Sequence, residues 1–426
     1  MVKLFKDLAE HPGVKQLGPG LVTGAADDDP SGIATYSQAG AQFGFNMLWT
    51  VVFTYPLMVG IQMVSARIGC ITGRGLAANI KAVFPRSVLF GIVGLLLVAN
   101  TVNIAADIAA MGQALTLLIG GSARLYSVIL GLLCLGLQVF LRYEKYVGYL
   151  KWLTLALLSY VAVVFTAHVP WGEVVRQLAF PSLTLDRDTI LTIAAVFGTT
   201  ISPYLFFWQA AQEMEDLKTH AGRTGSPALP HASQVARAHL RRIRWDTCLG
   251  MGFSNIVAFF VILSAAVTLH SAGITNIQTS AQAAAALRPL GGPLTFLLFS
   301  LGIIGTGMLA VPVLAGSAAY AVTESFDWKT GLDMQVHEAK EFYGIIAFAT
   351  VGGVLLNFTG LDPIRALLWS ADINCVIAVP IMAVMLKLGT DPTIMGSFAI
   401  RSRLRNVGWV ATTLMGVTVG AMFATL

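Results

Sequence analysis

Long apolar runs dominate the chain, and the short polar connections between them hold nearly all the charged residues. A membrane-spanning helix needs roughly 20 mainly apolar residues, and the chain offers about eleven such runs. To within a few residues, the pattern predicts spanning helices over 16–40, 46–70, 87–119, 125–141, 147–168, 189–212, 246–270, 291–324, 341–359, 363–388 and 406–425. No soluble domain is left over, so we expect one transmembrane domain over residues 1–426.

Composition supports this prediction, since 56% of the residues are hydrophobic and only 12% are charged, about half the charged fraction of a soluble domain. The first residues, MVKLFKDLAEHPGVKQLGPG, stay basic and polar for too long to be a cleaved signal peptide, so we expect the first helix to be retained. The four cysteines form no CxxC pair. Neither a disulfide framework nor a zinc site is therefore expected.

The distribution of Lys and Arg predicts the orientation. With a cytoplasmic N-terminus, 22 of the 27 basic residues lie in inner connections. The positive-inside rule then places the N-terminus in the cytoplasm of a multi-pass inner-membrane protein, and eleven helices place the C-terminus outside. The basic run ARAHLRRIRWD before the seventh helix is expected to meet anionic lipid headgroups rather than nucleic acid.

Two of the predicted helices are interrupted at mid-membrane depth, the first in GLVTGAADDDPSGIATYSQAG and the sixth in ILTIAAVFGTTISPYLFFWQA. Proline removes a backbone donor and disfavours helix at the preceding residue. Because the breaks lie five helices apart, we expect inverted repeats over about 16–168 and 189–388, followed by an extra helix over about 406–425. Paired broken helices in such repeats are the best sequence indicator of a transporter's binding site.

Asp27, Asp28 and Asp29 lie in the first break, where each carboxylate costs at least roughly 2.5 to 3.5 kcal/mol within a bilayer. No Lys or Arg lies in the predicted apolar cores, so a cation, water, a bound proton or a backbone dipole must compensate. Consecutive helical residues point about 100° apart, so the three face one ion only if the backbone unwinds. We expect Asp29, next to Pro30, to be the main metal ligand with Asp28 or Asp27 assisting; alternatively, one or two are protonated and bonded to neighbouring helices.

Hydroxyl groups mark the sixth helix. Thr199, Thr200 and Ser202, together with the carbonyls freed before Pro203, are hard oxygen ligands suited to magnesium, calcium, manganese or sodium. The same hydroxyls can instead bond back to their own helix. Five more polar residues inside predicted helices either line an ion pathway or cross-link helices: Asn103, Asp107, Asn255, Asp372 and Asn374.

These segments resemble those of the NRAMP-type metal transporters. GPGLVTGAADDDPSGIATYSQAGAQFG looks like their first helix, in which GPG precedes an Asp-Pro-Gly-Asn break, and ANTVNIAADIAAMGQAL and FGTTISPYLFF resemble the third and sixth. The resemblance implies an all-α, LeuT-like fold working by alternating access. It also implies a metal held by Asp and Asn of the first break and by Met and a carbonyl of the sixth, with Asp29 as the retained Asp.

The chain departs from this pattern at Gly32, where the family has Asn, at Ser202, where it has Met, and at Tyr204, where a His usually follows the proline. A thioether favours softer metals, so its loss disfavours classical transition-metal selectivity. The acid expected three residues after Asp107 is Ala110, and the ninth helix lacks the arginines of proton-coupled members. The pattern is similar to NRAMP-related magnesium transporters, and we expect no family-type proton coupling.

The leading hypothesis is a secondary transporter for a hard divalent cation, magnesium first and manganese second. The alternative is a sodium-coupled bicarbonate transporter, with the anion at the half-helix N-termini Ser31–Gly32 and Pro203–Tyr204 and sodium at the aspartates. An intramembrane aspartyl protease that pairs Asp29 with Asp107 or Asp372 is disfavoured, because the Gly-x-Gly-Asp motif is missing. We expect no enzymatic activity, no cofactor besides the transported or coupling ion, no partner besides that ion and the bilayer, and a monomer.

Overall fold

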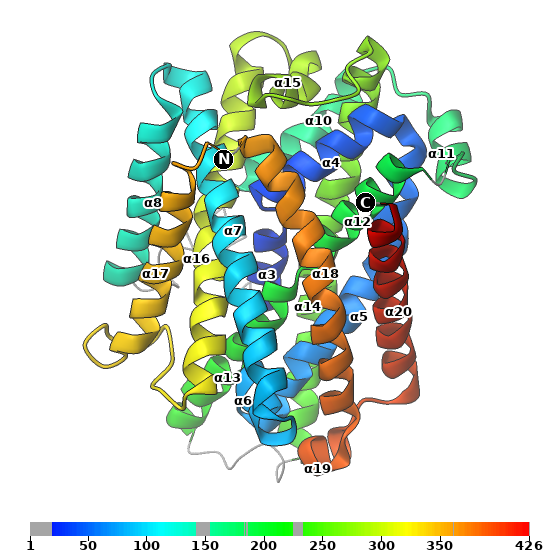
Figure 1. Ribbon diagram of the computed structural model, residues 1–426. Helices are drawn as coiled ribbons and strands as arrows, with labels where there is room; N and C mark the ends of the chain where they lie inside the picture. The colour runs from blue at the N-terminus through cyan, green and yellow to red at the C-terminus, as the bar shows by residue number, and fades with distance from the viewer. Residues whose placement is uncertain are drawn as a thin grey trace.

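The computed structural model describes residues 19–141, 154–182, 184, 186–224, 233–360 and 362–425, and every regular element within these residues is helical (Figure 1). Both predicted interruptions are confirmed. The first helix divides into α3 (Pro19–Asp27) and α4 (Pro30–Phe43), and the sixth divides into α12 (Arg187–Thr200) and α13 (Pro203–Thr224). Each second half begins at a proline, which fits the first turn of a helix because its missing N–H would be unpaired there in any case.

The remaining α-helices follow the predicted order. They are α5 (Leu48–Thr72), α6 (Leu76–Val83), α7 (Arg86–Ile119), α8 (Ala123–Phe140), α10 (Leu158–Thr166), α11 (Trp171–Ala179), α14 (Ser233–Thr268), α15 (Ser280–Ala284), α16 (Gly292–Ser325), α17 (Lys340–Leu356), α18 (Pro363–Thr390), α19 (Pro392–Met395) and α20 (Ser402–Thr425). Short 3-10 turns connect several of them.

Among the described residues, eight helical stretches are long and apolar enough to cross a membrane, or nine if one bent pair is a single span. That pair joins Leu155–Thr166 to Trp171–Ala179 with a bend of 117°. One of the eight stretches, Pro30–Thr72, contains both α4 and α5, and the 17-residue α17 matches the predicted ninth span. Residues 142–153, which hold the start of the predicted fifth span, lie outside the described residues.

Two predicted boundaries are wrong. The sixth helix was expected to end at residue 212, but α13 continues to Thr224. The seventh helix was expected from residue 246, but α14 begins at Ser233 and so includes the basic run. Arg and Lys are good helix formers, so charge alone does not end a helix.

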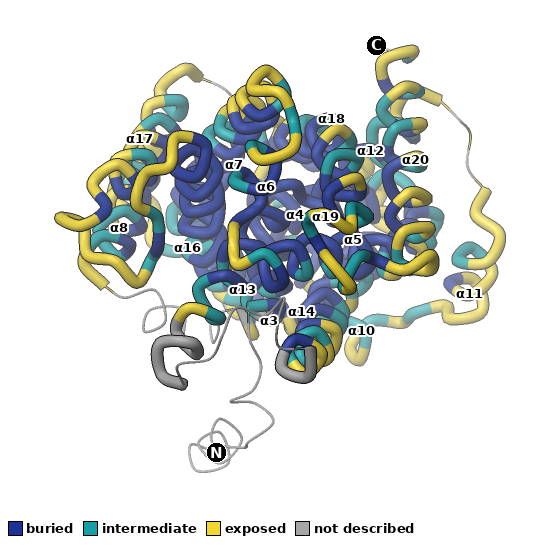
Figure 2. The backbone as a smooth tube through the Cα atoms, turned by 90° about the horizontal axis from the view of Figure 1, so that it is seen from below, coloured by how far each residue is buried: buried dark blue, intermediate teal, exposed yellow. Residues whose placement is uncertain are grey.

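The two half-helices α3 and α4 lie at the centre of the bundle, and α14 packs along both of them (Figure 1). Seen from below, the centre is buried, whereas α8, α17 and α20 at the periphery have exposed outer faces (Figure 2). These faces carry large apolar side chains such as Leu132, Phe348 and Val417. A periphery of this kind suits contact with lipid tails.

Glycines bring the broken helices close to their neighbours. A β-carbon on Gly24 of α3 would overlap the carbonyl of Gly250 on α14, and one on Gly198 of α12 would overlap the carbonyl of Ala371 on α18. Small residues allow such close backbone approach between membrane helices. The breaks are thereby fixed against α14 on one side and α18 on the other.

Candidate ion-binding site

Asp29 is the residue on which α4 begins. Its backbone is extended, with φ −68° and ψ 168°, and its Oδ1 accepts a hydrogen bond from the Gly32 amide at 2.6 Å. A carboxylate at this position caps the helix and interacts favourably with the positive end of the helix dipole. The local sequence Asp-Pro thus ends one helix and begins the next. It also fixes the Asp29 carboxylate between them, where the residue is only 3% exposed.

The hydroxyls of the second break bond back to their own helix, as one of the two sequence interpretations had it. The Ser202 Oγ donates to the carbonyls of Thr199 at 2.8 Å and Gly198 at 3.1 Å, and the Thr200 Oγ1 donates to the Val196 carbonyl at 2.6 Å. These bonds use the hydroxyl hydrogens. The oxygens keep lone pairs, so the bonds do not prevent them from acting as ligands.

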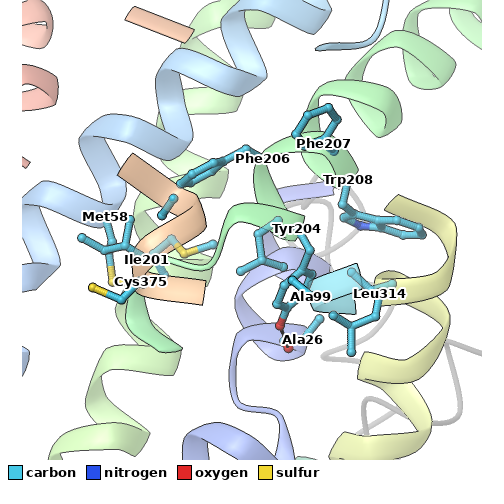
Figure 3. Close-up of a cluster of buried hydrophobic side chains, with 14 of the residues drawn as sticks. Ala26, Met58, Ala99, Ile201, Tyr204, Phe206, Phe207, Trp208, Leu314 and Cys375 are labelled. Carbon is cyan, nitrogen blue, oxygen red and sulfur yellow. Dashed lines mark hydrogen bonds between the residues drawn. The ribbon is translucent and has the colours of Figure 1, made fainter. Parts of the chain in front are cut away.

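Two hydrogen bonds join the first break to the second. The Tyr204 hydroxyl donates to the Ala26 carbonyl at 3.0 Å, as Figure 3 shows, and the hydroxyls of Tyr36 and Thr200 lie 2.9 Å apart. All four residues are buried. The two breaks therefore face each other at the centre of the bundle.

Oxygens from both breaks converge on Gly32. A β-carbon at this position would lie 3.2 Å from the Thr199 Oγ1, 3.3 Å from the Asp27 carbonyl oxygen and 3.4 Å from the Asp29 Oδ1. A hydroxyl, a carbonyl and a carboxylate thus lie against Gly32, and a side chain at this position would crowd them. These are hard ligands of the type preferred by magnesium and calcium.

Asp27 and Asp28 meet at one hydroxyl. The Ser254 Oγ on α14 lies 2.7 Å from the Asp27 Oδ2 and 3.0 Å from the Asp28 Oδ1. A single hydroxyl hydrogen cannot satisfy both carboxylates at once, so a proton or a cation must help to compensate this buried pair. Asp28 therefore faces α14 together with Asp27, whereas Asp29 faces Gly32.

Asn255 was among the predicted pathway residues, whereas its neighbour Ser254 was not. Asn255 is only half-buried, and no described residue pairs with its Oδ1. The buried positions Met251, Ser254 and Ala258 lie three or four residues apart, so helical periodicity along α14 points to Ser254 as the inward residue.

Known proteins show which family has this arrangement. The family model described as natural resistance-associated macrophage protein-like matches residues 20–425. This chain belongs to the NRAMP family.

Two curated relatives share its sequence at low identity. The "Divalent metal cation transporter MntH" of Acidiphilium cryptum is 26% identical over 395 residues, which cover 90% of this chain and 84% of the relative. The protein of the same name from Klebsiella pneumoniae is 26% identical over 411 residues, which cover 94% and 91%. NRAMP members are membrane transporters, so this chain is a multi-pass inner-membrane transporter and the protease hypothesis is excluded.

Solved structures share its fold. The Eremococcus coleocola manganese transporter superposes with a TM-score of 0.75 at 18% identity, covering 97% of this chain and 88% of that one. Mhp1, a nucleobase-cation-symport-1 family transporter, superposes with a TM-score of 0.57 at 15% identity, covering 96% and 92%. The LeuT-like fold that the resemblance to NRAMP-type transporters implies is confirmed.

In this NRAMP chain, α7 presents two polar residues to the site. Asp107 lies near Asp29 and is fully buried. Asn103, one turn earlier, is also fully buried, and no described residue pairs with either side-chain oxygen of Asp107 or with the side-chain amide of Asn103. Buried polar groups without partners require water, a proton or an ion.

The other predicted residues lie on the α18 side. The Ser31 Oγ lies 2.9 Å from both the Leu367 carbonyl and the Ser370 Oγ, which ties α4 to α18. Asn374 is buried, and no described residue pairs with its Oδ1. Asp372 is half-buried and lines a cavity of about 480 Å³ that also reaches Thr35 of α4.

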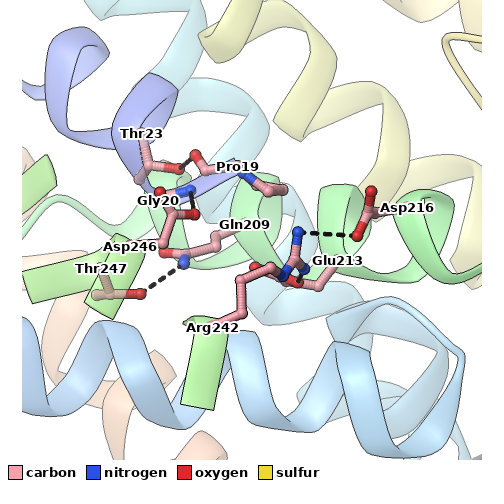
Figure 4. A network of polar contacts seen from close by, with 9 residues as sticks. All are labelled: Pro19, Gly20, Thr23, Gln209, Glu213, Asp216, Arg242, Asp246 and Thr247. Atoms are coloured by element: carbon pink, nitrogen blue, oxygen red, sulfur yellow. Dashed lines mark hydrogen bonds and ion pairs between the residues drawn. The ribbon is translucent and has the colours of Figure 1, made fainter. Parts of the chain in front are cut away.

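At the opposite end of the broken helices, the structure contains a polar network that the sequence did not predict (Figure 4). Arg242 of α14 pairs with Glu213 at 2.6 Å and with Asp216 at 2.9 Å, both on α13. Asp246 accepts a hydrogen bond from the Gly20 amide at 2.7 Å, which holds the start of α3. The prediction that the basic run meets headgroups is therefore wrong for Arg242, whose charge is used inside the protein.

Within the described residues, no three His, Cys, Asp or Glu side chains form a group that could hold a metal. The oxygens around Gly32 are instead of mixed type, and only one of them is a carboxylate. An ion that must be released after each cycle suits a site of few charged ligands.

Proposed function

We propose that this NRAMP protein is a secondary transporter that moves a hard divalent cation, magnesium first and manganese second, by alternating access. The observation that carries the proposal is the convergence of three oxygens on Gly32, from the Thr199 hydroxyl, the Asp27 carbonyl and the Asp29 carboxylate. Magnesium accepts oxygen ligands, holds its own water tightly and is usually bound by one or two carboxylates.

The type of ligand supports a hard ion. Ser202 brings a hydroxyl where the family's thioether is expected, and Gly32 leaves room for water where the family's Asn is expected. One thioether lies near the break. The side chain of Met111 and the Pro30 ring both lie against Gly307 of α16. Met111→Leu is therefore a necessary control, and we expect it to leave metal preference unchanged.

The α4 N-terminus argues against the bicarbonate alternative. There the Asp29 carboxylate already accepts the Gly32 amide, so an anion at the same N-terminus would meet a negative charge. The α13 N-terminus begins with Pro203, which has no N–H to offer. The negative charge of Asp27, Asp28 and Asp29 at this break favours a cation instead.

We further propose that transport does not use the family's proton coupling, and that the N-terminus is cytoplasmic. Asp107 remains beside Asp29, but Ala110 replaces the acid expected one turn later, and α17 carries no arginine. A proton taken up at Asp107 has no second acid there to receive it. The excess of Lys and Arg in the predicted inner connections supports the orientation.

Reconstituted liposomes containing a magnesium-sensitive dye test the proposal. Wild type, Asp29→Ala and the control Glu341→Gln, an exposed acid on α17, are compared with magnesium or manganese outside. We expect metal entry in wild type and in the control, and a loss of at least about 100-fold in Asp29→Ala, as for a residue whose charge is used during transport. Entry should not depend on a pH gradient.

The same liposomes discriminate between the hypotheses. Sodium-dependent bicarbonate uptake without metal entry would overturn the cation proposal and favour the anion. If metal entry acidified the lumen in proportion to the flux, the cation proposal would stand, but the proposal that transport is not coupled to protons would be overturned.

A further inference from the structure

The cavity of about 480 Å³ lies between α4, α12 and α18 and is lined by two acids from different helices. Asp188 comes from the first turn of α12 and Asp372 from the middle of α18. Asp188, Asn276 and Trp369 are exposed at its rim, whereas Thr35 is 1% exposed. We call this cavity the outer vestibule, because it opens beside the connections that the proposed topology places outside.

The outer vestibule has the charge of a cation site. No Lys or Arg is found among its described lining residues, so its two carboxylates are not neutralised by basic neighbours in the wall. The Oδ1 of Asp372 and the Oγ1 of Thr35 are buried, and neither has a hydrogen-bond partner among the described residues. A buried carboxylate oxygen and a buried hydroxyl without partners at one cavity point to a polar occupant.

One wall of the outer vestibule is held rigid. The Gln38 side chain accepts the Ile277 amide at 2.9 Å and donates to the Thr275 carbonyl at 3.2 Å and to the Gln42 side chain at 3.1 Å. These bonds fix the connection after α14 against α4. A preformed cavity loses little freedom when it binds an ion.

The outer vestibule leads to the candidate site along two helices. On α4, Thr35 follows Ser31 by four residues, and on α12, Ala195 precedes Thr199 by four residues. Four residues of helix span about 6 Å. The inner end of the vestibule therefore lies about one helical turn from the oxygens around Gly32.

We propose that the outer vestibule is a second cation site, which holds a hydrated divalent cation between Asp188 and Asp372 before the ion reaches Asp29. The volume is sufficient, because six waters occupy about 180 Å³ at the density of the liquid. Magnesium is typically bound through one or two carboxylates while it keeps several waters. The inference rests on the proposed function, but the binding can be measured without transport.

Trp369 on the rim provides a reporter, since manganese quenches nearby indole fluorescence. Manganese is titrated into purified full-length Asp29→Ala protein, which removes the inner carboxylate and leaves the vestibule intact. Trp369→Phe in the same background identifies the part of the signal that arises at the vestibule among the eight tryptophans. We expect saturable quenching that Trp369→Phe abolishes.

The acids are then neutralised one at a time. Asp188→Asn and Asp372→Asn should each raise the manganese Kd by at least about tenfold, as expected for loss of a contact with a charged group. Asp186→Asn is the matched control, because Asp186 caps the same end of α12 but does not line the cavity. Asp188 is exposed, so its variant should fold even if Asp372→Asn does not.

Hexaamminecobalt(III) tests whether the ion is hydrated, because it resembles a hexahydrated cation and does not exchange its ligands. It should displace manganese from the vestibule of Asp29→Ala. Failure to compete would overturn a hydrated occupant.

An equal Kd change in Asp186→Asn and Asp188→Asn, or the absence of saturable quenching at Trp369, would overturn the site. The two proposals fail separately. A vestibule signal in a protein that transports no metal would refute the proposed function alone, and metal transport without that signal would refute this inference alone.

Discussion

The two sides of the candidate site are built in opposite ways. On the side of α3, α13 and the start of α14, charged groups are paired, as in Arg242 with Glu213 and Asp216, and Phe206 and Phe207 are fully buried (Figures 3 and 4). On the opposite side, the Asp372 Oδ1 and the Thr35 Oγ1 have no partner among the described residues and border a cavity of about 480 Å³.

This difference indicates which side is closed. Paired charges and close-packed aromatic rings hold helices together, whereas unpaired oxygens at a cavity are ready to receive water or an ion. The structure is therefore closed at the α13–α14 end. In an alternating-access cycle, the paired side must lose its contacts when the ion leaves.

The largest effect should come from removing Arg242. Arg242→Gln leaves the fully buried Glu213 without its cation, and breaking such a pair costs about 3–5 kcal/mol. We expect a large drop in thermal stability in detergent. The neighbouring exposed Arg241→Gln should have no effect, and equal losses in both variants would mean that the pairing does not hold this side closed.

A smaller effect is expected where α3 meets α14. Gly24→Ala puts a methyl group into the Gly250 carbonyl, and overpacking of this kind costs about 1–3 kcal/mol. Thermal unfolding should show the loss. Gly136→Ala on α8, where no atom lies within 4 Å of an added β-carbon, serves as control and should be neutral or slightly stabilising. A Gly24→Ala protein as stable as wild type would show that this contact is loose.

The candidate site between the two sides can be changed in selectivity rather than stability. Gly32→Asn with Ser202→Met restores the amide and thioether of the family pattern. We expect the ratio of manganese or cadmium flux to magnesium flux to rise by about tenfold, because a thioether favours the softer ions. Competition in liposomes measures this ratio. An unchanged ratio would mean that these two positions do not select the metal.

The smallest effect concerns Asp186, which caps α12 but does not line the vestibule. Hydrogen bonds from the Thr189 amide at 2.9 Å and the Thr184 hydroxyl at 2.7 Å hold the pKa of Asp186 below its ordinary value. A carboxyl with a lowered folded-state pKa stabilises the protein above its unfolded value, and this contribution is lost as the pH falls through the folded value.

The difference in melting temperature between wild type and Asp186→Ala should therefore have its largest value at pH 6 and decrease below about pH 4. Asp186→Asn keeps an uncharged cap, so its difference from the Ala variant should not vary with pH in this way. A wild-type advantage that persists at low pH would contradict the role of the charge.

The sequence alone predicted the features that depend on neighbouring residues in the chain. Asp29-Pro30 and Ser202-Pro203 predict both breaks, because a proline and its preceding residue constrain the backbone wherever they occur. The same local chemistry predicted that Asp29 differs from Asp27 and Asp28. The start of α14 was missed because a basic run is polar yet strongly helix-forming.

Contacts between distant segments could not be predicted in this way. Gly20 and Asp246 are 226 residues apart, and neither position carries a pattern that names the other. The same holds for Ser254, which meets Asp27 and Asp28 only because α14 packs along α3. The vestibule acids Asp188 and Asp372 likewise come from separate helices, and each looks unremarkable in its own segment.

The contact between Gly24 and Gly250 also restricts the path by which the closed side can open. The space between these two residues admits a hydrogen atom and no side chain. If α3 slid along α14 or rotated about its own axis, Thr23 or Ala25 would enter that space and collide with the backbone. The available motion is a tilt that lifts the start of α3 away from α14, with the unwound residues at Asp28 and Asp29 as its pivot.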